Sequence, residues 1–274
     1  MQIAFENKHV RLKNCRYGPM LYLPADVYIG QALDKYGEFS EGEAFFLRSC
    51  VRSDWTVLDL GANHGSHTVA LAKITRVVHA FEPQRILFQL LCANVALNAL
   101  TNVYTHQAAV GRSCGTINVP TLNYTKSGNF GAVVLGGTGG EEVPLVTVDS
   151  LALPACHFIK MDVEGMEGDA ITGAKETLHQ HRPILYVENN DSTKSAALIA
   201  QLFALDYRLY WHLTPYFNPK NYFGLAENIY GRTITIDMLC VHRTHPSHPQ
   251  HLPEVLSPTD TWDNAWSEFN HAKH

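Results

Sequence analysis

The sequence predicts an α/β fold in which a mostly parallel sheet is covered by helices on both faces. Short segments rich in Val, Ile and Leu alternate with segments of helix length from residue 55 to residue 205. These strand segments are apolar along most of their length, as in strands that are buried on both faces. The strand expected at 55–60 runs into a glycine turn and a helix start, which is where α/β proteins bind nucleotide-like ligands.

The predicted elements follow the chain in order. Residues 17–29 alternate like a strand but contain glycine and proline breaks, so short ribbons and loops are expected there. A helix is expected at 41–51, before the alternating core begins. The core strands are expected at 55–60, 77–82, 103–106, 157–163 and 184–188, and the core helices at 66–74, 84–98, 166–179 and 192–205.

The regular alternation stops between residues 111 and 148. Strands are expected at 115–119 and 143–148. The segment 128–140 is rich in glycine and has no clear period. We interpret it as an insertion or a lid, with a low-complexity linker as the alternative.

The C-terminal part of the chain has a different pattern. Strands at 207–213 and 233–242 have no helix between them, which predicts an antiparallel pair at a sheet edge. The tail from residue 244 is rich in His and Pro and is expected to be irregular. Its aromatic residues have the spacing of one terminal helix; these are Trp262, Trp266 and Phe269.

The bulk composition limits the partners of the protein. The formal net charge of −5 gives no basic stripe for nucleic acid, and no apolar run approaches the ~18 residues of a membrane span. No signal-peptide pattern is present in residues 1–20, and six scattered cysteines without a C-x-x-C pair indicate reduced thiols, so a cytoplasmic protein is expected. A homo-oligomer is left open.

The domain organisation follows from the absence of repeats and linkers. We expect one domain over residues 1–274, because no internal repeat and no credible linker interrupts the chain. Within it we expect an N-terminal extension at 1–44, a catalytic core at 45–243 and a C-terminal tail at 244–274.

The glycine turn favours adenosylmethionine over a dinucleotide. Asn63 and Ser66 replace the second and third glycines of the dinucleotide fingerprint. Adenosylmethionine carries no phosphate, and its ammonium, sulfonium and ribose diol suit nearby carboxylates. Asp59 stands at the end of the first strand, and Glu82 ends the next strand about twenty residues later, where α/β sites place a ribose-binding acid. Ser66 is expected to cap the helix that follows.

Three motifs then resemble one family. Asp59–Gly65 (DLGANHG), Ala80–Pro83 (AFEP) and Ile159–Glu167 (IKMDVEGME) are similar, in this order, to the FkbM-type family of S-adenosylmethionine-dependent methyltransferases. Supporting pieces are Tyr36–Phe39, Asn94–Asn98 and Arg182–Glu188, so the resemblance covers about 36 to 243. It implies a class I methyltransferase fold, a Rossmann-like sheet of seven strands with an antiparallel last strand. His64, His67 and the stretch 124–140 depart from the family pattern.

The resemblance and the turn together predict the cofactor residues. The methionine end of the cofactor is expected to lie in the turn, at Gly61, Ala62, Asn63 and Gly65. Glu82, followed by Pro83, is expected to bind the ribose hydroxyls; the alternative is a solvated acid at a strand end. Gln107 and Ala108 are the candidates for adenine contacts, with a plain loop as the alternative.

The candidate catalytic residues are acids. If the strand continues through Asp162 and Glu164, both side chains point to the same side of the sheet, and their proximity raises one pKa as a general base requires. Alternatively Asp162 meets the ammonium of the cofactor while Glu164 faces the substrate, or Glu164 only caps the following helix. Glu188, at the end of the fifth strand, is a second candidate base.

For several other side chains, a structural role is the alternative to a functional one. His64 could reach the substrate mouth, but a solvated side chain at a helix start is the alternative. Four histidines recur every three residues, yet prolines interrupt them and no cysteine joins them, so no metal is expected; they are His242, His245, His248 and His251. An aromatic group could line a sugar or polyketide site or simply pack; it comprises Tyr216, Phe217, Tyr222 and Phe223.

The resemblance to this family implies, as the leading prediction, an O-methyltransferase that acts on a hydroxyl of a small molecule, sugar or secondary metabolite. An N-methyltransferase for a peptide or amine is the nearest alternative. A nicotinamide-dependent oxidoreductase and a cofactor-binding scaffold without catalysis are the alternatives from other classes, and the broken glycine fingerprint counts against the oxidoreductase.

Overall fold

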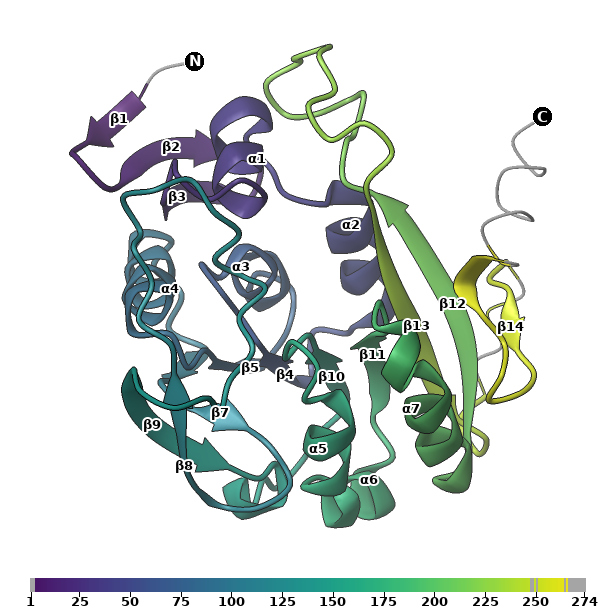
Figure 1. Cartoon of the computed structure of the whole chain (residues 1–274). Coiled ribbons are helices and arrows are strands. Elements are labelled where there is room, and N and C mark those ends of the chain that lie inside the picture. Colours follow the sequence, from purple (N-terminus) through teal and green to yellow (C-terminus); the bar gives the residue numbers. More distant parts are fainter. Residues whose placement is uncertain (1–2, 247–248, 250, 264, 266–274) are drawn as a thin grey trace.

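One twisted sheet organises the computed structural model, which describes residues 3–246, 249, 251–263 and 265 (Figure 1). Its order across the described chain is β14-β12-β13-β11-β10-β4-β5-β6. The bounds are β4 Thr56–Leu60, β5 Val77–Phe81, β6 Val103–His106, β10 Phe158–Met161, β11 Ile184–Glu188, β12 Tyr207–Pro215, β13 Ile234–His242 and β14 Glu254–Val255. The five strands from β6 to β11 are parallel, and β13 is antiparallel to both of its neighbours. The predicted α/β class is confirmed.

Helices cover both faces of this sheet. On one face lie α2 (Glu41–Cys50), α3 (Ser66–Ala72) and α4 (Arg85–Leu97); on the other lie α5 (Glu167–Thr172), α6 (Lys175–His181) and α7 (Ser192–Ala204). The strand side chains that meet these helices are almost entirely apolar and buried, as expected for strands covered on both sides. Two hydrophobic layers therefore hold the sheet, and polar groups collect at the strand ends.

The predicted helix at 166–179 is wrong in one respect, because two helices form there. The break falls at Gly173, where an added Cβ would lie 2.1 Å from the carbonyl oxygen of Gly111. The side chain of Asp149 then accepts hydrogen bonds from the backbone N–H groups of Glu176 and Thr177 and caps the start of α6. Asp149 begins a short 3₁₀ turn, Asp149–Leu151.

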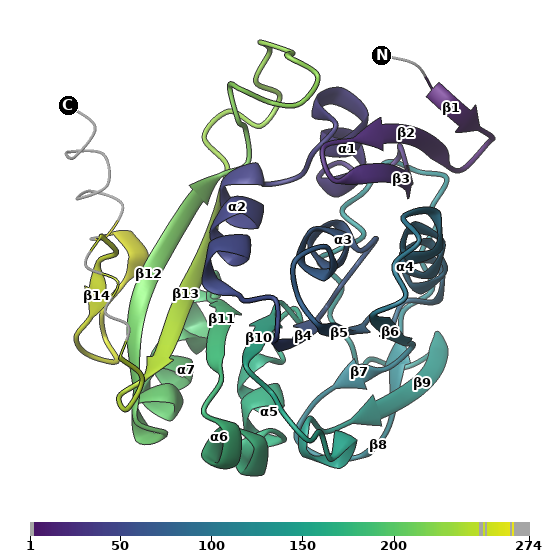
Figure 2. The ribbon, with the colours of Figure 1, turned by 180° about the vertical axis from the view of Figure 1, so that it is seen from behind.

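The N-terminal region packs over α3 and α4 at the top of both views (Figures 1 and 2). It contains an antiparallel ribbon of β1 (Ile3–Glu6), β2 (Arg11–Cys15) and β3 (Gly18–Tyr22); of these, only β3 falls within the segment 17–29 where ribbons were expected. Helix α1 (Ile29–Tyr36) follows and was not predicted. Its buried side chains contact aromatic residues of the loop after β12, so long-range packing stabilises this short helix.

The region between β6 and β10 forms a second, smaller sheet. It has the order β7-β9-β8, with β7 at Ala109–Val110, β8 at Gly115–Val119 and β9 at Glu141–Val146. Between β8 and β9, the chain leaves this sheet, passes α4, reaches the N-terminal region and returns (teal in Figure 1). We call residues 122–135 of this excursion the strap.

The C-terminal edge contains the expected antiparallel pair. β13 lies between β11 and β12 and is antiparallel to both. The tail was predicted to be irregular, yet β14 pairs with β12 and adds an eighth, two-residue strand beyond the seven expected. It forms because Val255 is buried against the main core. Trp262 packs against the same core, whereas Trp266 and Phe269 lie outside the described residues.

Two bulk predictions can be compared with the structure. All six cysteines are free thiols, as expected. Among the helices that the structure describes, none combines the length and the apolar character that crossing a bilayer requires.

Candidate functional site

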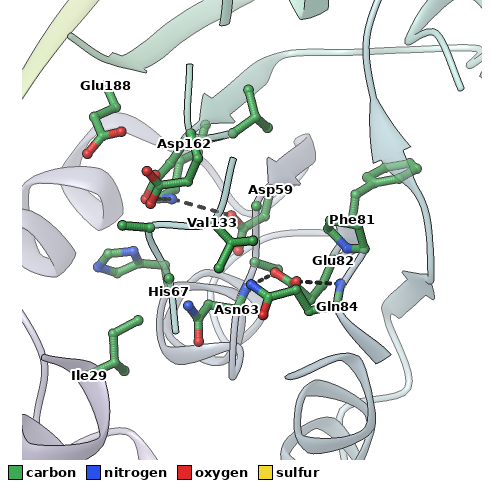
Figure 3. Close-up of a pocket in the computed structure, with 18 of the residues that line it drawn as sticks. Ile29, Asp59, Asn63, His67, Phe81, Glu82, Gln84, Val133, Asp162 and Glu188 are labelled. Carbon is green, nitrogen blue, oxygen red and sulfur yellow. Dashed lines mark hydrogen bonds and ion pairs between the residues drawn. The ribbon is translucent and has the colours of Figure 1, made fainter. Parts of the chain in front are cut away.

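A cavity of about 290 Å³ opens at the carboxyl ends of β4, β5, β10 and β11 (Figure 3). This is the edge at which open α/β sheets bind ligands. The strap contributes one wall, and α1 with the loop after β12 contributes another. Glu82, Gln84 and Phe81 lie at one side of the cavity, and Asp162, Glu188 and His67 lie at the other.

The glycine turn after β4 forms the floor. The N–H groups of Gly61 and Ala62 both donate to the carbonyl oxygen of Phe81, at 3.0 and 2.9 Å. Gly61 has φ +81°, and a Cβ there would lie 1.7 Å from the carbonyl oxygen of Asp162, so no other residue fits. The turn therefore ties β4 to both neighbouring strands.

Ser66 does not cap α3 as predicted. The helix begins at Ser66 itself, and Gly65, with φ +84°, stands at the cap position without a side chain to contribute. The hydroxyl of Ser66 is buried, has no hydrogen-bond partner and borders the cavity. Its oxygen is therefore available to a ligand instead of the helix backbone.

Glu82 is held rigidly at the end of β5. One carboxylate oxygen accepts the N–H of Asn63 at 3.0 Å, and the other accepts the N–H of Gln84 at 2.8 Å. Burial raises the pKa of Glu82 to about 7, although these two hydrogen bonds oppose the shift. The alternative of a solvated acid is wrong, because Glu82 is only 4% exposed and lines the cavity.

A buried lysine links the acids of β4 and β10. Asp59 and Lys160 are register partners on these adjacent strands. The Lys160 ammonium lies 3.1 Å from Asp162 Oδ2 and 3.8 Å from Asp59 Oδ1. Burial alone would lower the pKa of Lys160, but Asp162, Asp59 and Glu43 together raise it, so the lysine stays charged. Asp59 Oδ2 also accepts a hydrogen bond from Thr68 at 2.6 Å, whereas the buried Oδ1 has no hydrogen-bond partner.

Three carboxylates converge beside this lysine. Asp162, Glu164 and Glu188 each present an oxygen atom, and these atoms all lie within 4.8 Å of one another. The condition that the strand continues through Asp162 and Glu164 is not met: β10 ends at Met161, before the predicted end at 163, and Glu164 has the left-handed φ of +54°. The strained turn at Glu164 nevertheless brings its carboxylate to the group.

The pKa values of two of these acids are raised. Burial is the largest cause that raises the pKa of Glu164, and repulsion from Asp162 and Glu167 adds to it, so that this pKa is about 7. Burial, followed by Asp162 and Glu164, raises the pKa of Glu188 well above its usual value. Glu164 does not cap α5: Met166 stands at the cap position without a side-chain hydrogen bond, and Glu167 accepts the N–H groups of Val163 and Gly165 in the turn before the helix.

Sequence reasoning missed a pair beneath the cavity. His67 lines the cavity, and its Nε2 lies 3.7 Å from an oxygen of Glu43 on α2. Burial lowers the pKa of His67 to about 4 and raises that of Glu43 to about 7. One signal was present in the sequence: Glu43 stands one helical turn before the buried Leu47, which is an unusual position for an acid.

Most predicted cofactor residues meet in this one cavity. Those that line it are Asp59, Gly61, Ala62, Asn63, Glu82, Pro83, Ala108 and Asp162. Gln107 and Gly65 do not line it; Gly65 instead packs against Leu91, where a Cβ would lie 2.7 Å from a methyl group. His64 was expected at the substrate mouth or in solvent, but it is fully buried away from the cavity, and burial lowers its pKa to about 3.

The expected aromatic group does not form a single cluster. Only Tyr216 reaches the cavity, where it packs edge-to-face against Tyr28 and Phe39 with ring centres 5.6 and 5.4 Å apart. The other members lie outside: Phe217 contacts Tyr36, and Tyr222 pairs with Phe223. Chain reversal in the loop after β12 separates them.

The histidine series of the tail forms no metal-ligand group in the part of the chain that the structure describes, although His248 lies outside that part. Within that part, the acid trio is the only group of three potential metal ligands that the structure brings together.

Comparison with known proteins gives a family match. A family profile described as the methyltransferase FkbM domain matches residues 59–209, which is more than half of the chain. No curated protein matches the chain.

Solved structures are similar over about three quarters of the chain. An FkbM methyltransferase from Methylobacillus flagellatus is 20% identical with a TM-score of 0.49 and covers 71% of this chain and 46% of its own. A precorrin-6y C5,15-methyltransferase from Geobacter metallireducens is 11% identical with a TM-score of 0.49 and covers 74% of this chain and 86% of its own. This chain thus spans less than half of the Methylobacillus protein.

Proposed function

The chain belongs to the FkbM family of methyltransferases, and from this premise we propose that it transfers the methyl group of S-adenosylmethionine to a hydroxyl group of a small molecule. The observation that carries the proposal is the convergence of Asp59, Glu82 and Asp162 on one cavity at the carboxyl edge of the sheet. A ligand with separated cationic and diol groups matches such a ring of acids.

The residues of the cavity fit this cofactor. Asp59 Oδ1 is a buried carboxylate oxygen without a hydrogen-bond partner, and the Lys160 ammonium is 3.8 Å away, so a ligand donor would complete its surroundings. The glycine turn leaves room for a ligand beside the backbone. Together these features supply a negative, closely fitting floor for a cationic molecule.

Each acid takes a distinct role in the proposal. Glu82, fixed by two backbone N–H groups, would bind the ribose hydroxyls. Asp59 and Asp162 would hold the ammonium group, and Gly61, Ala62 and Asn63 would enclose the methionine end. When bound, S-adenosylmethionine supplies a methyl group that its sulfonium activates for displacement.

The acid trio would accept the proton that the acceptor hydroxyl loses. Asp162 is paired with Lys160, so one of its oxygens is already occupied. Glu164 has a pKa near the physiological range and can accept the proton of a hydroxyl as its oxygen attacks, with Glu188 as the second candidate. The cavity wall of Tyr28, Phe39 and Tyr216 would hold the acceptor.

An amine acceptor is the second candidate function, and the acid trio favours it specifically. Three carboxylate oxygens within 4.8 Å would attract a cationic amine and then remove its proton. Family membership leaves the nicotinamide oxidoreductase alternative without support.

Calorimetry with S-adenosylmethionine and S-adenosylhomocysteine tests the proposal. We expect binding in the micromolar range and at least a tenfold loss, about 1.4 kcal/mol, in Glu82→Ala. Glu142→Ala is the matched control, because this acid is exposed on β9. Absence of binding by the wild-type protein would overturn the proposed function.

Turnover measurements then test whether Glu164 is the general base. With a panel of hydroxylated and amine acceptors, S-adenosylhomocysteine formation should rise with pH through about 7, because Glu164 accepts a proton only when ionised. Glu164→Gln should lower turnover more than cofactor affinity and remove that pH dependence. Unchanged turnover would point to Glu188 instead.

A further inference from the structure

The strap is fastened to the N-terminal region at one point. The N–H of Val27 donates to the carbonyl of Gly128 at 3.0 Å, and the N–H of Gly128 donates to the carbonyl of Ala25 at 3.1 Å. Two residues later, Phe130 is buried among Leu23 and leucines of α4. The strap therefore crosses the cavity at the carboxyl ends of the strands instead of extending into solvent.

Gln84 joins the strap to the acid expected to bind ribose. Its backbone N–H donates to Glu82, while its side-chain amide donates to the carbonyl of Phe130 at 2.7 Å. Tyr124, at the start of the strap, donates to the side-chain oxygen of Gln84 at 3.1 Å. One residue thus contacts both the strap and Glu82.

The middle of the strap forms a wall of the cavity. Gly131, Val133 and Leu135 line it, and Figure 3 shows Val133 projecting between the Glu82 side and the Asp162 side. Ala108 and Val110 also line the cavity, so it offers apolar side chains from both the strap and the sheet. A flat purine ring suits such a cavity, because it buries both faces against apolar side chains.

Gly131 marks a close approach of the strap to the floor. A Cβ at this position would lie 3.3 Å from the side-chain nitrogen of Asn63 and 3.9 Å from a carboxylate oxygen of Glu164. Gly131 therefore faces two cavity residues that the proposed function uses, one on the cofactor side and one on the acceptor side.

The first residues of the strap border an open space. A second cavity, of about 600 Å³, lies between residues 122–125, β3 and α4, and its lining includes Leu21, Leu90 and Leu122. A void beside a segment removes packing contacts that would otherwise hold it in place.

From these contacts we infer that the strap is part of the cofactor site: it closes over the adenosine half, and Gln84 couples its closure to the binding of ribose by Glu82. The inference rests on the proposed function. Because the strap and Glu82 share Gln84, a ligand that orders one stabilises the other, so strap closure and cofactor affinity are linked.

Paired glycine variants test the inference by calorimetry with S-adenosylhomocysteine. Gly131→Val should weaken binding by about tenfold or more, because the new side chain meets Asn63 on the cavity wall. Gly137→Val is the control: it lies between the same two strands, has no atom within 4 Å of an added Cβ, and should bind within about twofold of wild type. Neither glycine has the positive φ that would itself disfavour valine.

Hydrogen exchange on the wild-type protein gives a second readout. S-Adenosylhomocysteine should slow amide exchange at 129–135 by about tenfold or more, and Gln84→Ala should reduce this protection while its backbone N–H still holds Glu82. Equal binding by both glycine variants, or unchanged exchange in the strap, would overturn the inference. If wild-type protein fails to bind the ligand at all, the proposed function fails first, which is a distinguishable result.

Discussion

At the scale of single residues, the site is built from acids that the protein keeps out of water. Glu82 and Glu43 are nearly inaccessible, and burial raises the pKa of each to about 7. An exposed glutamate has a pKa near 4.5, so each of these groups disfavours the folded state at neutral pH. Such a cost is common where a side chain is retained for ligand binding instead of stability.

Replacement of Glu82 by glutamine should reveal this cost. Between pH 4.5 and 7 the folded protein binds more protons at Glu82 than the unfolded chain does, so its stability falls as pH rises through this window. Glutamine removes that dependence. The unfolding free energy of Glu82→Gln minus that of wild type should therefore be about 2–3 kcal/mol more favourable at pH 8 than at pH 5.

Urea unfolding of the ligand-free proteins at the two pH values measures this difference. Glu142→Gln, at an exposed position, is the control and should follow wild type at both. A gap between Glu82→Gln and wild type that does not change with pH would show that Glu82 titrates as an ordinary surface acid.

At the scale of elements, one buried side chain joins α4, β3 and the cofactor turn. Asn94 of α4 is fully buried and accepts the N–H of Leu21 at 2.6 Å. Its amide donates to the carbonyls of Leu21 and His64 at 2.9 and 2.8 Å. The last of these bonds fixes the backbone of His64, whose side chain is fully buried.

Asn94→Ala should destabilise the protein by about 3 kcal/mol, because it leaves three backbone groups without their partner. Chemical denaturation measures the loss. Gln89→Ala on the same helix is exposed and should change stability by less than about 0.5 kcal/mol. A loss below about 1 kcal/mol in Asn94→Ala would mean that water replaces these hydrogen bonds.

At the scale of the whole molecule, the exposure of each cysteine thiol shows whether its region belongs to the buried core. Cys156 and Cys240 are buried in the main core, whereas Cys114 is exposed next to the small sheet. Hydrogen bonds from Ser150 and Thr147 lower the pKa of Cys114. Exposure and a larger thiolate fraction both accelerate reaction with a disulfide reagent.

Thiol titration of the native protein should accordingly show Cys114 reacting first, and the denatured protein should release all six thiols. Cys114→Ser should remove the fast phase without affecting the others. A reducing agent should leave the melting temperature unchanged, since the folded protein contains no disulfide. Fewer than six thiols after denaturation without reductant would contradict the structure.

The sequence by itself determined the features that depend on neighbouring residues. The alternation of strands and helices follows from burial on both sheet faces, and the turn at Gly61 follows from a positive φ that glycine adopts without strain. The position of Glu82 at a strand end is likewise local. These signals were sufficient to indicate the fold class, the cofactor turn and the acids around it.

Only the tertiary structure decided which distant groups meet. The trio of Asp162, Glu164 and Glu188 depends on the register of β10 with β11 and on a left-handed turn that no periodicity signals. The approach of Glu43 to His67 and of the strap to Gln84 depends on packing between segments far apart in the chain. Local propensity encodes elements, whereas side-chain convergence follows from the long-range packing that no short stretch of sequence contains.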